Sequence, residues 1–349
     1  MNCIVRKEGN QYTLYSFSTT KFYPLSNSNF IETFFSSKGV SDGLNSLNLS
    51  DKELSEVISK TPKTFNPLLF GSPLVVGLMV SNHCNIHCKY CIAYNSGGYS
   101  KTNILNENIE YLIEDFKSAG IIGILISGGE PTLNPELNNI LTLFAEKDFY
   151  ITLDSNAVVL DDKTIDILAM YRNIIPRISL DSNTAKIHNK YRGFFDQTFS
   201  NITKLIERGV DVRINTVLHN ENAAMLNEMA EWLITIGIKK WHIFKLQPQF
   251  APSNLHISDD LAESTISALK VHYAKYISIN CKFSKENDGF ASFVVDSELN
   301  CFSTDNRTKV KVIFGNLMEK GISEIWKETT MDFKIRHISK YLGIKEVAL

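Results

Sequence analysis

Apolar segments and amphipathic segments alternate between residues 74 and 247, and this alternation constrains the fold more than any other feature of the chain. The apolar segments have the length of buried strands, and the segments between them carry apolar residues at the three- and four-residue spacing typical of helices. The predicted strands lie near residues 74–80, 121–127, 149–154, 175–181, 211–218 and 240–246. The predicted helices lie near residues 104–119, 134–147, 161–171, 196–208 and 222–237. Six such repeats predict an α/β fold, a partial (β/α)6 TIM-type barrel, because a complete barrel of this type has eight units.

Polar motifs follow four of the predicted strands. In strand order, they are Cys84–Cys91, Gly128–Glu130, Asp154–Asn156 and Ser179–Asp181. Parallel α/β structures gather their functional residues at the carboxyl ends of the strands. The sequence therefore predicts one site at this end of the barrel.

The first motif contains three cysteines, Cys84, Cys88 and Cys91, in one predicted loop. Thiolates at this spacing can converge on one soft metal centre, and three of them leave one iron of a 4Fe-4S cluster without a protein ligand. A structural zinc site usually has four Cys or His ligands, and the nearby His83 and His87 keep zinc as an alternative. Three ordinary buried cysteines are the other alternative.

Composition limits the class of protein. The 349 residues include 36 basic and 38 acidic side chains, for a net charge of -2, so no charge excess favours a nucleic-acid partner. The first residues lack the apolar core of a secretion signal, and no uninterrupted apolar run approaches the ~18 residues of a membrane span. We therefore expect a cytoplasmic protein without a membrane association, in which the six cysteines are ligands or free thiols.

The cysteine spacing, with Tyr90 directly before the last cysteine, resembles the signature of the radical S-adenosylmethionine (radical SAM) superfamily. The Gly128-Gly129-Glu130-Pro131 turn, one βα step later, adds to the resemblance. The resemblance implies that Cys84, Cys88 and Cys91 hold a 4Fe-4S cluster and that SAM chelates its open iron. It further implies reductive cleavage of SAM to a 5'-deoxyadenosyl radical that abstracts hydrogen from a substrate.

The same resemblance implies roles for single residues in binding SAM. Tyr90 would lie near the adenine, Gly128 and Gly129 would let the backbone approach the methionine moiety, and Glu130 would accept hydrogen bonds from its ammonium group. A tight turn is the structural alternative for the glycines, and packing is the alternative for Tyr90.

The stretch His188-Asn189-Lys190-Tyr191-Arg192-Gly193 resembles the His-x-x-x-Arg-Gly segment of peptide-modifying and cofactor-building radical SAM enzymes. By this resemblance Ser179 binds the ribose and Arg192 pairs with the methionyl carboxylate. Asp181 and Asn156 are further candidates for cofactor binding. Helix caps, turns and surface positions are the alternatives for these residues. The fifth strand lacks the glycine pattern of the family, so no residue on it is assigned.

Two segments flank the predicted barrel of residues 71–250. Residues 1–70 predict a β-hairpin and one helix, which could recognise a peptide by adding a strand. Residues 251–349 predict an α+β appendage long enough to cap the open mouth of the barrel.

The appendage resembles the accessory domain called SPASM or twitch, through Phe314-Gly315-Asn316-Leu317 and Ser323-Glu324-Ile325-Trp326. That domain contains many cysteines, whereas the appendage of this chain contains only two, Cys281 and Cys301. Because two thiolates do not complete a usual four-ligand cluster, we expect a degenerate domain without an auxiliary cluster.

The leading functional hypothesis is a radical SAM enzyme that acts on a peptide or protein side chain, as the maturases of ribosomally made peptides (RiPPs) do. Its partners would be that substrate and an external one-electron donor of the flavodoxin or ferredoxin type. A radical SAM enzyme of small-molecule cofactor or metabolite biosynthesis is the first alternative. A non-catalytic iron-sulfur or zinc module with a regulatory role is the second. No catalytic residue is assigned, although a thiol facing the substrate, Cys281 or Cys301, would suit the return of hydrogen in an epimerisation.

Overall fold

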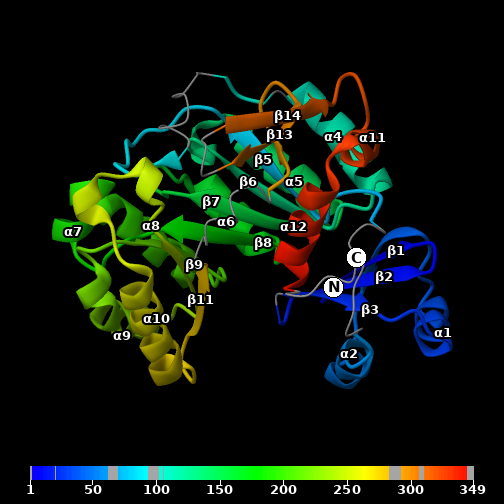
Figure 1. Cartoon of the computed structure of the whole chain (residues 1–349), viewed down its shortest axis with the longest axis horizontal. Coiled ribbons are helices and arrows are strands. Elements are labelled where there is room, and N and C mark those ends of the chain that lie inside the picture. The colour runs from blue at the N-terminus through cyan, green and yellow to red at the C-terminus, as the bar shows by residue number, and fades with distance from the viewer. Residues whose placement is uncertain are drawn as a thin grey trace.

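The computed structural model describes residues 2–19, 21–61, 70–92, 102–104, 106–282, 292–305 and 310–343. Six parallel strands form its centre, and each is followed by a helix or a loop and helix (Figure 1). The strands are β5 (Val75–Ser81), β6 (Gly123–Gly128), β7 (Tyr150–Ser155), β8 (Ile174–Ser179), β9 (Arg213–Leu218) and β10 (Lys240–Lys245). The helices that follow them on the outer face are α4 (Asn106–Ser118), α5 (Leu137–Glu146), α6 (Asp162–Met170), α8 (Phe195–Glu207) and α9 (Leu226–Thr235). The predicted fold class, a partial α/β barrel, is confirmed.

Alternation along each strand separates the helix-covered face from the inner face of this barrel. On β9, Ile214 and Thr216 are completely buried, and Thr216 accepts a hydrogen bond from the indole N–H of Trp241 at 2.8 Å. The alternate residues of the same strand, Arg213 and Asn215, point to the inner face because successive side chains of a strand point in opposite directions. The outer face is therefore the hydrophobic core, and the inner face is largely polar.

The C-terminal segment widens the sheet at both edges. Strand β11 (Ser278–Lys282) pairs with β10 in parallel, while β12 (Val294–Val295) pairs with β5 and continues into the antiparallel strands β13 (Asn300–Asp305) and β14 (Val310–Asn316). The helices of this segment are α10 (Asp259–Tyr273), α11 (Ile322–Glu328) and α12 (Met331–Leu342). The sequence indicated that this segment is long enough to cap the barrel mouth. Its short strands β11 and β12 find their hydrogen-bond partners at the two edges of the barrel sheet.

The N-terminal segment is a separate antiparallel sheet of strand order β3-β2-β1-β4 with two helices. Its elements are β1 (Cys3–Glu8), β2 (Gln11–Ser16), β3 (Lys21–Leu25), α1 (Asn29–Ser37), β4 (Gly43–Leu47) and α2 (Asp51–Ile58). The β1–β2 hairpin and α2 correspond to the predicted hairpin and helix, and β3, β4 and α1 come in addition. The predicted boundary near residue 70 adjoins residues 62–69, which lie outside the described residues.

This N-terminal sheet contacts the amino ends of the barrel strands. The ring of Tyr15 lies 4.3 Å from that of Tyr150, the first residue of β7, and the guanidinium of Arg6 donates to the carbonyls of Ser72 and Pro73 just before β5. The predicted site lies at the opposite, carboxyl ends of the same strands. The sheet therefore sits on the far side of the barrel from the cysteines.

Short elements border the carboxyl ends of the strands. They are η2 (Pro131–Leu133), α7 (Ala185–Tyr191), η3 (Ala223–Met225), η4 (Pro248–Phe250) and η5 (Ser253–Leu255). Tyr90 packs there in a small hydrophobic cluster with Tyr191, Leu246 and Leu255. Among the helices that the structure describes, none is both long and apolar enough to traverse a bilayer.

Candidate functional site

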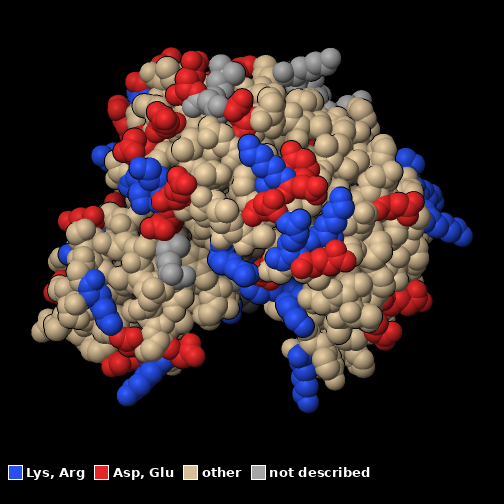
Figure 2. All heavy atoms as spheres, turned by 180° about the vertical axis from the view of Figure 1, so that it is seen from behind, with Lys and Arg blue, Asp and Glu red and all other residues tan. Residues whose placement is uncertain are grey.

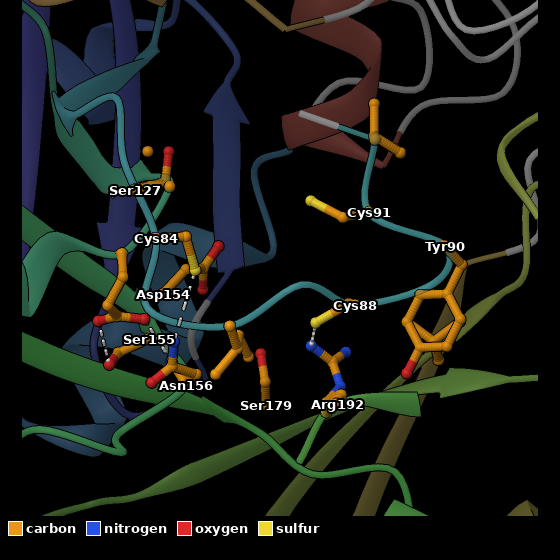
Figure 3. Close-up of a pocket in the computed structure, with 16 residues that line it drawn as sticks. Cys84, Cys88, Tyr90, Cys91, Ser127, Asp154, Ser155, Asn156, Ser179 and Arg192 are labelled. Atoms are coloured by element: carbon orange, nitrogen blue, oxygen red, sulfur yellow. Dashed lines mark hydrogen bonds between the residues drawn. The ribbon is translucent and has the colours of Figure 1, made fainter. Parts of the chain in front are cut away.

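A cavity of about 480 Å³ lies at the carboxyl ends of the barrel strands and is lined by Cys84, Cys88 and Cys91. Figure 3 shows the three sulfur atoms directed toward the same space. The volume lies within the range of about 300–1,000 Å³ typical of small-molecule sites. The chain therefore brings its three predicted metal ligands to one wall of a cofactor-sized cavity.

The spacing of the thiols bears on the kind of metal that they fit. Among the described residues, no three His, Cys, Asp or Glu side chains lie close enough together to hold one ion. A mononuclear zinc site needs such convergence, whereas thiolates that bind a 4Fe-4S cluster each take a different iron and stand further apart. His83, one of the two histidines considered for zinc, is hydrogen-bonded through Nδ1 to the hydroxyl of Ser81 at 3.0 Å. The donor set fits an iron-sulfur cluster.

Gly128 and Gly129 place the end of β6 against the backbone of the cysteine loop. The N–H of Gly129 donates to the carbonyl of Ser81 at 2.7 Å, and the N–H of Glu130 donates to the carbonyl of His83 at 2.8 Å. A Cβ on Gly128 would overlap the carbonyl of Ser81, and one on Gly129 would overlap the carbonyl of His83. Both glycines also line the cavity. The two glycines are thus required by the close contact between the end of β6 and the cysteine loop. The prediction had assigned them only to the close approach of a cofactor.

Glu130 joins three loops at the floor of the cavity. Its carboxylate is 1% exposed and accepts hydrogen bonds from the Ser155 hydroxyl at 2.6 Å, the Asn156 backbone N–H at 2.7 Å and the Thr132 hydroxyl at 2.8 Å. Burial raises the pKa of Glu130, and these donors oppose the shift. Most of the accepting capacity of this carboxylate is therefore used to hold the ends of β6 and β7 together.

Asp181 and Arg192 form a buried ion pair beside Cys88. The Nε of Arg192 donates to Asp181 at 2.6 Å, and its Nη1 lies 3.6 Å from the Sγ of Cys88. The hydroxyl of Tyr90 also donates to Asp181, and the guanidinium stands 5.4 Å from the centre of the Tyr90 ring. Burial raises the pKa of Cys88 to about 11, and the cation of Arg192 opposes that shift. Asp181 is completely buried and positions Arg192 and Tyr90, both of which line the cavity.

The His-x-x-x-Arg-Gly stretch is helix α7 and its end. The Nδ1 of His188 accepts a hydrogen bond from the backbone N–H of Asp181 at 3.3 Å. Arg192 is the C-cap residue that ends α7. Gly193 has φ +90°, a left-handed conformation that side chains rarely adopt. The motif therefore orients Asp181 and Arg192 from one short helix.

The remaining predicted residues also meet at the cavity. Ser179 lines it from β8, and Asn156 lines it from the end of β7, where its amide donates to Asn85 at 2.8 Å and lies 3.8 Å from the Sγ of Cys84. The sequence interpretation missed Asp154 and Val217, which line the same cavity. Asp154 stands in the strand-end triplet that contains Asn156, and that position was the available signal.

Cys281 and Cys301 lie away from this cavity. They stand on β11 and β13, near opposite edges of the ten-stranded sheet. Cys281 packs against the hydrophobic core on the α10 side, and Cys301 is completely buried, which raises its pKa. Neither thiol faces the inner face of the barrel. The structure gives no support for either as the substrate-facing hydrogen donor considered from the sequence.

Comparison with known proteins yields one family model, the radical SAM superfamily, which matches residues 78–233. The AdoMet-dependent heme synthase of Oleidesulfovibrio alaskensis is 25% identical over 183 residues, which are 51% of this chain and 47% of that protein. The antilisterial bacteriocin subtilosin biosynthesis protein AlbA of Bacillus subtilis is 26% identical over 174 residues, 49% of this chain and 39% of that protein. The chain thus spans about half or less of the length of these curated relatives.

Among solved structures, Streptococcus suis SuiB bound to the precursor peptide SuiA has a TM-score of 0.74 at 16% identity, over 96% of this chain and 89% of that one. SuiB has also been solved with S-adenosylmethionine, with a TM-score of 0.69. At this identity the likeness shows a shared fold, which includes the segments before and after the barrel.

The radical SAM superfamily uses a 4Fe-4S cluster and SAM, and the three cysteines, the Gly-Gly-Glu turn and the barrel of this chain have the corresponding arrangement. The resemblance stated from the sequence is confirmed. Residues 78–233 of this chain are a radical SAM domain.

Proposed function

We propose that the protein is a radical SAM enzyme that abstracts hydrogen from a peptide or protein side chain. Cys84, Cys88 and Cys91 would hold the 4Fe-4S cluster. The observation that carries the proposal is the convergence of these three thiols on one cavity with Ser179, Asn156 and Arg192. When bound, a 4Fe-4S cluster and SAM together supply a 5'-deoxyadenosyl radical.

The chain's own residues would bind and orient the cofactors. Ser179, Asn156 and Tyr90 present polar or aromatic groups to the cavity, and Arg192 presents a guanidinium with its orientation fixed by Asp181. Glu130 would act chiefly by positioning Asn156 and the Gly128–Gly129 backbone. The buried, hydrogen-bonded state of Glu130 and Asp181 keeps these groups in place without reorganisation when the cofactors bind.

A peptide substrate is supported by the extent of the structural likeness. The likeness to SuiB, solved with its precursor peptide, extends over the N-terminal sheet and the C-terminal strands as well as the barrel. Strands β3 and β4 are the edges of the N-terminal sheet, and a peptide can bind such an edge as an added strand. The reducing electron would come from an external flavodoxin- or ferredoxin-type donor.

A small-molecule substrate is the second candidate. Three AdoMet-dependent heme synthases match the chain at 22–25% identity, a range similar to that of the maturases AlbA and SkfB at 26% and 21%. The level of identity therefore does not separate the two substrate classes, although a PqqA peptide cyclase and mycofactocin maturases also match, at 23% and 24% identity. The N-terminal sheet, which a small-molecule substrate would not require, is the reason for preferring a peptide.

The experiment that tests the activity is anaerobic reconstitution with iron and sulfide, followed by reduction with dithionite in the presence of SAM. We expect 5'-deoxyadenosine and methionine in the products. A reconstituted protein that binds the cluster but yields no 5'-deoxyadenosine would instead support a non-catalytic iron-sulfur module.

The experiment that tests the substrate class adds candidate short peptides encoded beside the gene to the same reaction. We expect a peptide whose mass changes only when SAM and reductant are both present. A mass change in a small metabolite, with all such peptides unmodified, would favour the second candidate.

A further inference from the structure

Three cations form one row across the inner face of the barrel. Arg177 of β8 is the register partner of Arg213 on β9, and Arg213 is the register partner of Lys240 on β10. Neighbouring strands are about 4.8 Å apart, so the three side chains start side by side. They share the inner face with Asp154, which lines the cofactor cavity and pairs with Arg177 at 2.5 Å. We call Arg177, Arg213 and Lys240 the cationic row.

The negative charge near the cationic row is smaller than its positive charge. Within the described residues, its acidic partners are Asp154, which takes both nitrogen atoms of one edge of Arg177, and Asp211. Asp211 is about half exposed and lies 3.5 Å from Arg213 and 4.0 Å from Lys240, too far for a short ion pair with either. Three cations thus face two acidic side chains, so among the described residues one positive charge of the row has no acidic counterpart.

Buried polar atoms without a hydrogen-bond partner adjoin the cationic row. In the part of the chain that the structure describes, they are the Nε of Arg213, the Oδ1 of Asn215 and the Nε2 of His242. The pKa of His242 is lowered to about 3, chiefly by burial and to a smaller extent by the positive charges of Arg177, Arg213 and Lys240. A buried polar atom is normally paired, so such a group of atoms indicates a place that a ligand or water fills. Because the side chains of the row are cationic, a negatively charged ligand is favoured at this place.

The cationic row lies between the N-terminal sheet and the cofactor cavity. Arg177 is two residues below Ser179, the β8 residue that lines the cavity, which corresponds to about 7 Å along the strand. At the other side, the buried Arg213 lies near enough to Tyr15 of the N-terminal sheet to lower its pKa, although burial raises that pKa overall. A peptide that reached the cavity from the N-terminal sheet through the inner face would pass the row.

We infer that the cationic row binds a carboxylate of the substrate, the side chain of an Asp or Glu residue that stands about two positions from the residue presented to the cofactor cavity. The spacing follows because an extended peptide covers about 3.3–3.6 Å per residue. This inference rests on the proposed function and names its substrate class more closely, as an acidic peptide. Figure 2 shows Lys and Arg side chains along the notch between the two lobes of the molecule, on a face where acidic and basic groups are otherwise interspersed.

The test uses the full-length, cluster-reconstituted protein and three blocked peptides, acetyl-Ala-Ala-X-Ala-Ala-amide, in which X is Glu, Gln or Lys. Ligand-observed NMR titrations at constant ionic strength give the dissociation constant of each peptide. We expect the Glu peptide to bind about tenfold more tightly than the Gln peptide. This ratio of dissociation constants corresponds to the contribution of one charge-assisted hydrogen bond. The Lys peptide should bind more weakly than either.

Variants assign the preference to the cationic row. Lys240→Gln and Arg213→Gln should bring the Glu-to-Gln ratio close to one, and Lys240 is the decisive site because its partial exposure makes the substitution easy to accommodate. Lys245→Gln is the matched control, since Lys245 stands on the same strand outside the row and pairs with Asp259 at 2.5 Å. It should keep the full ratio.

Equal binding of the Glu and Gln peptides, or an unchanged ratio in Lys240→Gln, would overturn the inference. The titration needs neither reductant nor SAM cleavage. Its failure therefore leaves the formation of 5'-deoxyadenosine as a separate question, and a protein without that activity can still show the carboxylate preference.

Discussion

Single residues around the cavity fix one another's positions as well as face the cofactor space. Glu130 ties the ends of β6 and β7 to each other, and Asp181 holds Arg192 and Tyr90 beside Cys88. A buried carboxylate of this kind is costly to leave without its partners. Substitutions at these positions should therefore affect the geometry of the site before they affect the reaction itself.

The first residue-scale prediction concerns the cluster. In Cys88→Ala the remaining two thiolates should not retain a 4Fe-4S cluster, because each cysteine would supply the only protein ligand to one iron. Iron and sulfide content after reconstitution, the brown chromophore and 5'-deoxyadenosine should all be lost together. Cys281→Ala is the control, since Cys281 packs toward α10, away from the cavity, and should leave all three unchanged. Full SAM cleavage by Cys88→Ala would refute the ligand assignment.

The second residue-scale prediction concerns Gly129. A methyl group there would overlap the carbonyl of His83, so Gly129→Ala should displace the cysteine loop. We expect a loss of stability of about 1–3 kcal/mol, as for other overpacked sites, and poor cluster incorporation. Gly39→Ala is the control: its φ of +74° makes alanine unfavourable by about 1–2 kcal/mol, but nothing stands near its Cβ. It should lower the midpoint of thermal unfolding while the iron content stays normal.

The third residue-scale prediction concerns the stability of the protein at acidic pH. Burial lowers the pKa of His188 from 6.5 to about 4, so the folded protein keeps this imidazole neutral while the unfolded chain takes up a proton below pH 6.5. The stability contributed by His188 is complete above pH 6.5 and should be lost as the pH falls to about 4, by up to about 3 kcal/mol. Thermal unfolding of the cluster-free protein, followed by circular dichroism across this range, measures the loss.

A variant isolates the contribution of His188 to that acid sensitivity. His188→Gln should show a shallower pH dependence, because an amide can still accept the Asp181 N–H but does not titrate. The exposed His272 provides the control, and His272→Gln should follow the unmodified protein. Identical pH profiles for all three proteins would show that His188 is not the group involved.

At the scale of elements, the sequence pattern located the six central strands to within a few residues. It predicted strands at residues 74–80 and 240–246, and β5 and β10 span Val75–Ser81 and Lys240–Lys245. It did not predict β11, whose inner-face residues Ser278 and Asn280 are exposed, so that no apolar run marks the strand. Nor did it predict α7, which is short and polar and whose two buried side chains, His188 and Tyr191, contact Asp181 and Tyr90 beside the cavity.

An element-scale prediction concerns α11. Its Trp326 is completely buried and donates from the indole N–H to the carbonyl of Phe70 at 2.8 Å, which ties the C-terminal segment to the start of the barrel. Trp326→Ala should lower the free energy of unfolding by about 3–5 kcal/mol. Met331→Ala, at an exposed position on the next helix, should change it by less than about 0.5 kcal/mol. Urea denaturation compares the two, and a small effect at Trp326 would mean that α11 is not part of the cooperative core.

At the scale of the whole molecule, the N-terminal sheet and the cofactor cavity lie at opposite ends of the same barrel strands. Tyr15 and Phe17 of the sheet pack on Tyr150 at the amino end of β7, and Phe22 of β3 lies 6.0 Å from Tyr341 of α12. Aromatic contacts of this kind contribute more than their buried area alone. The three parts of the chain are therefore expected to unfold as one cooperative unit.

This coupling can be tested with the three tryptophans, Trp232, Trp241 and Trp326, none of which is in the N-terminal sheet. Tyr15→Ala should shift the urea midpoint reported by tryptophan fluorescence to lower concentration, since it removes a buried ring shared between the sheet and the barrel. The expected loss is about 3–5 kcal/mol. Tyr276→Ala, at a position that is 61% exposed, should leave the midpoint unchanged. An unshifted midpoint in Tyr15→Ala would mean that the sheet unfolds independently.

The sequence by itself determined the local features of this protein: the period of its strands and helices, the cysteine spacing and the placement of polar motifs after strands. These depend on residues close together in the chain, so their pattern is visible without the fold. Only the tertiary structure decided that Gly129 meets His83, that Asp181 holds Arg192 beside Cys88, and that Arg177, Arg213 and Lys240 form one row. Those contacts join different strands and loops, and their geometry is set by the register between strands, which no single stretch of sequence contains.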